Sequence, residues 1–433
     1  MPYEGGNRLG AEKASKLGHI DVVKSPLVQK LIEEFEHPDE DNTPGEVKDN
    51  PIPEDQRSFP FVFAVDGSIQ PIDSKYGTTL RQVAFVKTAL FRLDQGKLLQ
   101  LDRTSPHPFA LRDIMRDSAL FHAVVFPLRN VRLGDKSVYD SVRQIIYEAL
   151  QDEKLKEISV FETLKWLAYQ KWDGKPKPSP DFQCPHCDEE VEGLRYDSDK
   201  GPCEKCGKEV YISDMLGFHL EMGEESAPGS VASAYMMVHE TLLLFSGIRH
   251  LWESGQEDLF DKCLFLKDGP LNLRSQYVKL IDPIRNFLDF AKKEGITIYL
   301  CGQEKTGLFV EHLELIGKRI PANHYFLPDN EYIRTHVQQR KANEQYGYRT
   351  NYGNKVFLKV GENHQLVVSI PPGKYIDSDT ASDLIGFDRI TGTLKDLLSF
   401  RHENALVPIE LAHGVASLST YPSAHIFRLF SGI

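Results

Sequence analysis

The chain has 433 residues and a mass of 49.2 kDa, and its 63 acidic side chains outnumber 51 basic ones, for a net charge of −12. Hydrophobic residues at 41% and charged residues at 26% exclude a wholly disordered chain or a fibre. No apolar run reaches the roughly 18 residues that span a bilayer, and the start lacks an apolar signal core, so we expect a cytoplasmic protein that does not enter a membrane. At first sight the acidic total argues against an anionic partner such as nucleic acid.

Most of the negative charge lies near the N-terminus. Residues 31–56 hold ten acids and one base, Lys48, and so carry −9, which leaves −3 on the other 407 residues. The stretch is rich in proline and poor in apolar residues, as is typical of loosely ordered chain. We therefore assign residues 1–57 to an acidic N-terminal extension. A solvated linker is the simpler interpretation, and an arm that binds a partner or mimics DNA is the alternative.

The pattern changes from strands to helices between residues 59 and 172. Residues 59–65 (FPFVFAV) are apolar and β-branched, which predicts a buried strand that ends at Asp66-Gly67-Ser68. Further strands with a helix are expected at 79–94 and 109–130, and one or two helices at 137–172.

Four of the six cysteines form two CxxC pairs, Cys184–Cys187 and Cys203–Cys206, with fifteen residues between the pairs. Two such turns can aim four thiolates at one point, which predicts a structural Zn²⁺ site in a zinc-ribbon-like module at residues 174–213. Two disulfides are the alternative, and they are rare in a cytosolic protein. His186 could replace one thiolate. The two remaining cysteines, Cys263 and Cys301, lie in apolar runs and are expected in the core.

Strands and helices alternate after the cysteines. Residues 230–252 are mostly apolar and free of proline, which predicts a helix buried in the core. This alternation predicts an α/β fold. The other expected elements are strands at 261–267 and 296–301, a helix at 280–294, a hairpin of 356–360 with 365–370, and a short helix at 410–419.

Three carboxylates could form a metal site. Asp66 and Asp268 each close an expected strand and precede a glycine, where a carboxylate can coordinate a hard cation that also binds a phosphate. Asp-Gly is also a common turn dipeptide. Glu240 lies in the apolar helix, where an ionised carboxylate is costly to bury without a partner such as a shared metal. A solvent-facing Glu240, or one paired with a nearby base, is the alternative.

Two more residues could complete this site. His413, in PIELAHGVAS, is a candidate ligand, or else an ordinary core or surface histidine. Lys305, in CGQEKTG, follows the strand expected at 296–301 and could hold a phosphate.

Four segments occur in a characteristic order: FVFAVDGS, LFLKDGPL after the Glu-bearing helix, ITIYLCGQEKTG and PIELAHGVAS. In this order they resemble the NurA nuclease family, from about residue 58 to the C-terminus. The resemblance implies an RNase H-like mixed-sheet core with flanking helices, formed by residues 58–173 and 214–433. The cysteine module would be an insertion that most relatives lack.

The resemblance also implies a function. It implies a DNA nuclease that uses Mn²⁺ or Mg²⁺, forms a ring-shaped homodimer and works with a HerA-type hexameric ATPase in DNA end processing or phage defence. The distance of 28 positions from Glu240 to Asp268 is longer than the resemblance leads us to expect, so Glu253 is an alternative to Glu240. The catalytic residues that the resemblance implies are Asp66, Glu240, Asp268, Lys305 and His413. All of them except Lys305 would be metal ligands.

A two-metal hydrolysis is the mechanism that this set of residues predicts. Two divalent ions about 4 Å apart would activate a water and stabilise the leaving oxygen. Asp66 would bridge the ions, and Glu240 and Asp268 would complete their coordination. His413 would bind one ion or orient the water, and Lys305 would steady a phosphate oxygen.

Residues 325–359 combine basic side chains with five tyrosines. Proteins that bind single-stranded nucleic acid use basic side chains to contact phosphates and aromatic side chains to stack on bases, so this pattern indicates DNA binding. A solvated basic loop is the alternative. The residues expected to bind DNA are Arg334, Arg340, Lys341 and Arg349.

Two other functions compete with a DNA nuclease. One is a non-catalytic zinc-ribbon adaptor that recruits a DNA-processing partner, and in it the carboxylates would be structural. The other is a different metal-dependent phosphotransfer enzyme acting on RNA or nucleotides. Because most of the negative charge lies in residues 31–56, the acidic total excludes only a broadly basic DNA coat.

Overall fold

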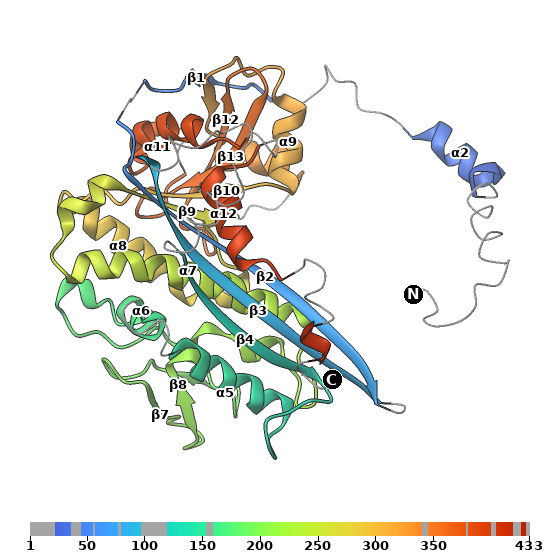
Figure 1. The fold of residues 1–433 in the computed structure, drawn as a ribbon, viewed down its shortest axis with the longest axis vertical. Coiled ribbons are helices and arrows are strands. Elements are labelled where there is room, and N and C mark those ends of the chain that lie inside the picture. Colours follow the sequence, from blue (N-terminus) through green and yellow to red (C-terminus); the bar gives the residue numbers. More distant parts are fainter. Residues whose placement is uncertain are drawn as a thin grey trace. The chain divides into compact units, whose positions relative to one another are not determined.

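The computed structural model describes residues 22–35, 45–54, 57–76, 79–96, 119–152, 159–339, 345–377, 380–399, 404–418 and 426–429 (Figure 1). The chain divides into two compact units, Met1–Gly45 and Glu46–Ile433. In the first unit, helix α2 (Pro26–Glu34) begins with a proline at its first turn, where the missing N–H costs no hydrogen bond. None of the residues of α2 is buried.

The second unit begins inside the acidic segment. Strand β1 (Asp49–Pro51) pairs antiparallel with β11 (His324–Phe326) and forms one edge of the main sheet. Part of the expected N-terminal extension is therefore sheet. Residues 36–44 of that segment lie outside the described residues.

The second unit is built on a mixed sheet of nine strands in the order β1-β11-β12-β13-β10-β9-β2-β3-β4. Strand β9 pairs parallel with both β2 and β10, and the other neighbours are antiparallel. The run β4-β3-β2-β9-β10 thus has three antiparallel strands followed by two parallel ones, the arrangement of an RNase H-like core. The strand bounds are β2 Phe61–Tyr76, β3 Thr79–Asp94, β4 Ala119–Arg129, β9 Cys263–Asp268, β10 Leu300–Glu304, β12 Asn354–Val360 and β13 His364–Ile370.

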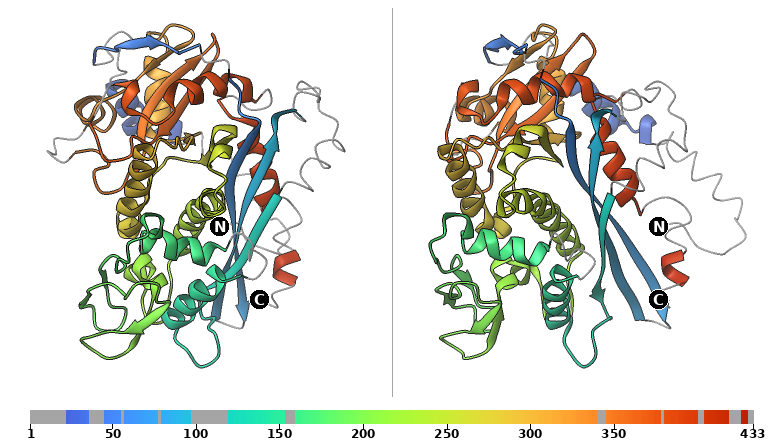
Figure 2. Two further views of the ribbon diagram at one scale, coloured as in Figure 1. Left: turned by 90° about the vertical axis from the view of Figure 1, so that its left-hand side faces the viewer. Right: turned by 60° about the vertical axis from the view of Figure 1, so that its left-hand side comes forward.

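Helices cover both faces of this sheet, which confirms the predicted α/β class. Successive strand residues point to opposite faces, so Val65 joins an apolar cluster with α7, whereas Ala64 joins a cluster with α12. Figure 2 shows α7 and α12 on opposite sides of β2 and β3. The helices are α5 Val138–Leu150, α6 Val160–Ala168, α7 Gly229–Glu253 and α8 Ile281–Lys293 in the first cluster, α11 Phe387–Leu394 and α12 Val407–Ala416 in the second, and α9 Leu308–Ile316 in a third.

Helix α7 is the central helix of the first cluster. By length and composition it could cross a membrane, but 78% of its most apolar window is buried inside the protein. Its apolar residues pack on β2, β3 and α6. This agrees with the buried helix predicted at residues 230–252.

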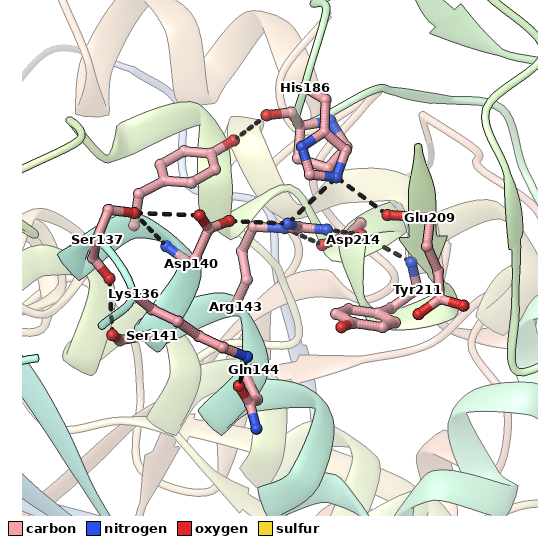
Figure 3. A network of polar contacts seen from close by, with 12 residues as sticks. Lys136, Ser137, Asp140, Ser141, Arg143, Gln144, His186, Glu209, Tyr211 and Asp214 are labelled. Carbon is pink, nitrogen blue, oxygen red and sulfur yellow. Dashed lines mark hydrogen bonds and ion pairs between the residues drawn. The ribbon is translucent and has the colours of Figure 1, made fainter. Parts of the chain in front are cut away.

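The four cysteines lie in two small hairpins between α6 and α7. The hairpins pair β5 (Phe182–Gln183) with β6 (Glu190–Val191) and β7 (Lys200–Pro202) with β8 (Glu209–Tyr211). A polar network joins them to α5 (Figure 3). At its centre Arg143 of α5 donates from Nε and Nη2 to the two carboxylate oxygens of Asp214, at 3.0 and 2.8 Å. Both side chains are buried, at 6% and 4% exposed. Asp214 directly follows the module and also accepts the backbone N–H of Tyr211 in β8 at 2.8 Å, so this bidentate pair connects the module to α5.

We expect Arg143→Ala to cost about 3–5 kcal/mol of the free energy of unfolding, because it leaves the buried Asp214 carboxylate without its cationic partner. Lys200→Ala is the matched control, since Lys200 pairs with Glu209 in the same module but both side chains are about half exposed. Because that pair is exposed to solvent, losing it should change the stability little. Denaturant unfolding measures both, and equal small losses would contradict the structural role of Arg143.

Candidate metal centres

Asp66 does not end its strand. The turn expected at Asp66-Gly67-Ser68 is wrong, because β2 continues through these residues to Tyr76 and pairs with β3 along its whole length. Gly67 has a different reason to be glycine. A Cβ at this position would lie 2.6 Å from Oε1 of Glu240 and closer still to Met236. The absence of a side chain at Gly67 therefore lets α7 approach the strand beside Asp66.

The parallel register of β2 and β9 aligns the two aspartates. Val65 is paired with Lys267, so Asp66 and Asp268 follow at the next position of each strand. Asp268 does end its strand, as expected, and Gly269 follows with a φ of +85°. The negative charge of Asp268 acts on the carboxyl group of Asp66 and contributes to raising its pKa, so the two side chains are near each other.

Lys305 and His413 both reach this pair of aspartates. Strand β10 lies next to β9 with Gln303 opposite Asp268, and Nζ of Lys305 is 3.1 Å from Oδ1 of Asp268. From α12, Nδ1 of His413 is 2.8 Å from Oδ2 of Asp66. The other oxygen of Asp66 accepts the backbone N–H of Gly67 at 2.7 Å. His413 is 54% exposed, whereas Asp66 is 5% exposed, so the histidine lies on the solvent side of the site.

Glu240, and not Glu253, is the glutamate of α7 at this site. The Glu240 carboxylate is 6% exposed, and the negative charges of Asp66 and Asp268 contribute to raising its pKa. Nζ of Lys267 lies 3.3 Å from its Oε2. Glu253 is 46% exposed at the end of the helix and pairs with Arg249. The structure thus places Lys305 and His413 in contact with the two aspartates, and Glu240 within range of the aspartates' charges.

Two of these carboxylates resist ionisation. Burial, reinforced by the charge of Asp268, raises the pKa of Asp66 from 3.8 to about 7. Burial also raises the pKa of Glu240 from 4.5 to about 7, although Lys267 acts in the opposite direction. A bound divalent cation would favour the ionised forms of both groups. Carboxylate oxygens with one imidazole suit Mg²⁺ or Mn²⁺, so the donor set fits the expected ion.

The cysteine site is the more compact centre. Sγ of Cys184 is 3.9 Å from that of Cys206, and Sγ of Cys187 is 3.9 Å from that of Cys203. A tetrahedral ZnS₄ site has sulfur–sulfur edges of about 3.8 Å, given Zn–S bonds of about 2.3 Å, whereas a disulfide needs about 2.05 Å. All four thiols are free. The geometry fits zinc and not the alternative of two disulfides.

The two centres differ in how closely their donor atoms meet. Among the described residues, the cysteines are the one set of three or more potential ligands whose donor atoms lie within 4.8 Å of one another. His186 stands apart from that set, because its Nε2 lies 3.0 Å from the backbone carbonyl of Glu209. In the acidic site, lysines contact two of the three carboxylates.

The structure describes only part of the segment expected to bind DNA, residues 325–359. Arg340 and Lys341 lie outside the described residues, while Arg334 is half-buried and Arg349 is exposed. Most of the aromatic side chains expected to stack on bases are in the core instead. The buried tyrosines are Tyr325, Tyr332 and Tyr352. Lys355 is also buried, and it pairs with Glu304. Tyr348, at 53% exposed, is the described tyrosine of this segment that most clearly reaches the surface.

Sequence reasoning missed Lys267. The signal was a single charged residue in the apolar run CLFLKD, directly before the candidate aspartate. A lysine at a strand end is usually solvated, so the pattern alone did not indicate a buried ammonium.

We expect Cys184→Ser and Cys206→Ser to lose the zinc that the wild-type chain retains, about one ion per chain, because each removes one of four thiolates. Cys263→Ala is the control, since this cysteine lies in β9 outside the cluster. Elemental analysis of purified proteins measures the zinc. Retention of a full equivalent by either serine variant would contradict the four-thiolate site.

We expect the protein without a divalent ion at the acidic site to lose stability as the pH rises from about 4 to about 7. Over this range the folded chain holds protons on Asp66 and Glu240 that the unfolded chain has released, so ionisation favours unfolding. An Asp66→Asn, Glu240→Gln double variant should lose this part of the pH dependence. Mn²⁺ should offset the wild-type loss near neutral pH, because the ion binds ionised carboxylates. Denaturant unfolding at several pH values, with and without Mn²⁺, measures both effects, and a wild-type pH profile equal to that of the variant would contradict the assignment.

Comparison with known proteins gives a similarity in structure alone. No protein-family model matches the chain, and no curated protein sequence matches it. The NurA nuclease from Sulfolobus solfataricus is similar over 98% of this chain and 97% of its own, at 9% identity and a TM-score of 0.35. A structure of NurA bound to dAMP and manganese is similar over 98% of both chains, at 11% identity and a TM-score of 0.24.

Proposed function

We propose that this protein is a divalent-metal-dependent nuclease that hydrolyses DNA. The observation that supports this most directly is the buried acidic cluster where β2 and β9 run side by side. It joins Asp66, Asp268 and Glu240 with a histidine and a lysine that reach the two aspartates. Such a cluster has a clear use in holding a cation against a phosphodiester, and it costs folding energy otherwise.

Four of these residues have a role that follows from their position. When bound, Mg²⁺ or Mn²⁺ would polarise the phosphate and lower the pKa of a water. Asp66 and Asp268 would hold the ion, and the hydrogen bond from Gly67 orients the Asp66 carboxylate. Lys305 is partly exposed beside Asp268 and can contact a non-bridging phosphate oxygen. His413 contacts Asp66 from the solvent side and can orient the attacking water.

The ordered motifs support the finer parts of the proposal. On the resemblance to NurA nucleases, the chain would act in the cytoplasm as a homodimer with a HerA-type hexameric ATPase, in DNA end processing or phage defence. The four thiolates would hold a structural Zn²⁺ in the inserted module. Arg334 and Arg349, with Arg340 and Lys341, would contact the DNA backbone.

We expect Asp66→Ala and Asp268→Ala each to lower cleavage of linear DNA by about 100-fold or more, because each removes a ligand of the ion. Glu240→Gln and Glu253→Gln form a matched pair on one helix. The first should impair cleavage, and the second should leave it close to the wild-type rate, because Glu253 lies outside the cluster. Initial rates with Mn²⁺ or Mg²⁺ measure this, and thermal unfolding checks that each variant is folded.

A substrate panel separates this function from its competitors. Linear, circular and single-stranded DNA and RNA would be tested with the same protein. Full activity in either aspartate variant would contradict the metal site. Metal-dependent cleavage of RNA alone would favour the phosphotransfer alternative, and no cleavage of any substrate would favour the adaptor.

A further inference from the structure

Lys267 is an unusual lysine because its ammonium group lies inside the protein. It is the fifth residue of β9, between Leu266 and Asp268, and is 3% exposed. Its register partner is Val65, whose side chain belongs to the apolar cluster around α7. Paired residues of neighbouring strands point to the same face. The Lys267 side chain therefore points toward α7, whereas Asp66, one residue further along β2, points to the opposite face and contacts α12.

The ammonium group of Lys267 is held by Glu240 and by the backbone. Nζ lies 3.3 Å from Oε2 of Glu240 and donates to the main-chain oxygen of Asp268 at 2.9 Å. The other oxygen of Glu240 lies against Gly67, where a Cβ would be 2.6 Å away. One side of the Glu240 carboxylate is thus in contact with a protein cation, and the other is against β2.

The formal charges of the acidic site limit how many divalent cations it can bind. Three carboxylates (Asp66, Glu240 and Asp268) face two ammonium groups (Lys267 and Lys305), which leaves a formal charge of −1 when all five are ionised. One divalent ion would make the site +1, which matches the single negative charge of a phosphodiester. Two divalent ions would make it +3 around the buried side chains of Asp66, Glu240 and Lys267, where like charges repel strongly.

We propose that Lys267 is a built-in cation that takes the place of a second metal ion at Glu240, so that the acidic site binds one divalent ion. This inference rests on the metal site of the proposed function, and it changes the two-metal mechanism expected from the sequence. The ion would bind at Asp66 and Asp268, on the face of the sheet that also holds His413. Lys267 is then a positioning residue, because it acts by fixing Glu240 between β2 and β9.

The test counts metal ions. Full-length protein with its cysteine site loaded with zinc is titrated with Mn²⁺, and electron paramagnetic resonance measures the free ion at each step. The wild-type chain should bind one Mn²⁺. Lys267→Met removes the charge while keeping a long side chain, so it should bind a second Mn²⁺ at the freed Glu240. Lys267→Arg restores the cation and should again bind one.

A double variant keeps the test decisive where Lys267→Met does not fold. Lys267→Met with Glu240→Leu replaces the buried ion pair by apolar side chains, a change that proteins often tolerate. It should still bind one Mn²⁺, through Asp66 and Asp268. Circular dichroism checks the fold of every variant.

Several results would overturn this inference. They are two Mn²⁺ ions bound by the wild-type chain, a single ion bound by a folded Lys267→Met variant, or loss of Mn²⁺ binding in the double variant, which would make Glu240 an essential ligand. The nuclease function fails separately. If the wild-type chain binds one Mn²⁺ and Lys267→Met binds two, while no nucleic acid is cleaved, the one-ion site stands and the proposed function does not.

Discussion

The parallel pairing of β2 with β9 is the constraint on which the acidic site depends. It brings two aspartates that are about 200 residues apart in the chain to the same level of the sheet, since Val65 is opposite Lys267 and Asp66 and Asp268 come next. A shift of one residue would turn one carboxylate to the other face. Two apolar clusters, one on each face, fix this register, because Val65 belongs to one and Ala64 to the other.

Burying this much negative charge requires cations, and the fold supplies two of its own. Lys305 contacts Asp268 from the partly exposed side, and Lys267 contacts Glu240 from within. These contacts offset only part of the charge, because burial still raises the pKa of both Asp66 and Glu240 to about 7. The remaining charge is what makes the cluster suited to a metal ion. The cysteine module is separate in chemistry, and it is fixed to α5 by the Arg143–Asp214 pair.

The local sequence pattern predicted secondary structure correctly where the residues of one short segment determine it. The apolar run at 230–252 became α7, and the hairpin at 356–360 and 365–370 became β12 and β13. The same reasoning failed at Asp66-Gly67, because the dipeptide looks like a turn while the glycine in fact admits Glu240. It also failed for the tyrosines of residues 325–359. Tyrosine has an apolar ring that suits a core as well as a binding surface, so its burial depends on what packs against it.

The sequence by itself determined the α/β class and the cysteine cluster, and it supplied the candidates for the acidic site with Glu240 and Glu253 both open, because motif order and CxxC spacing are properties of the chain. Only the tertiary structure decided how these groups are paired. It selected Glu240 over Glu253 through the path of α7, and it turned Lys267 into a buried partner of Glu240. The physical reason is that the balance of buried charge depends on which side chains face each other across packed elements, and neither composition nor spacing records this.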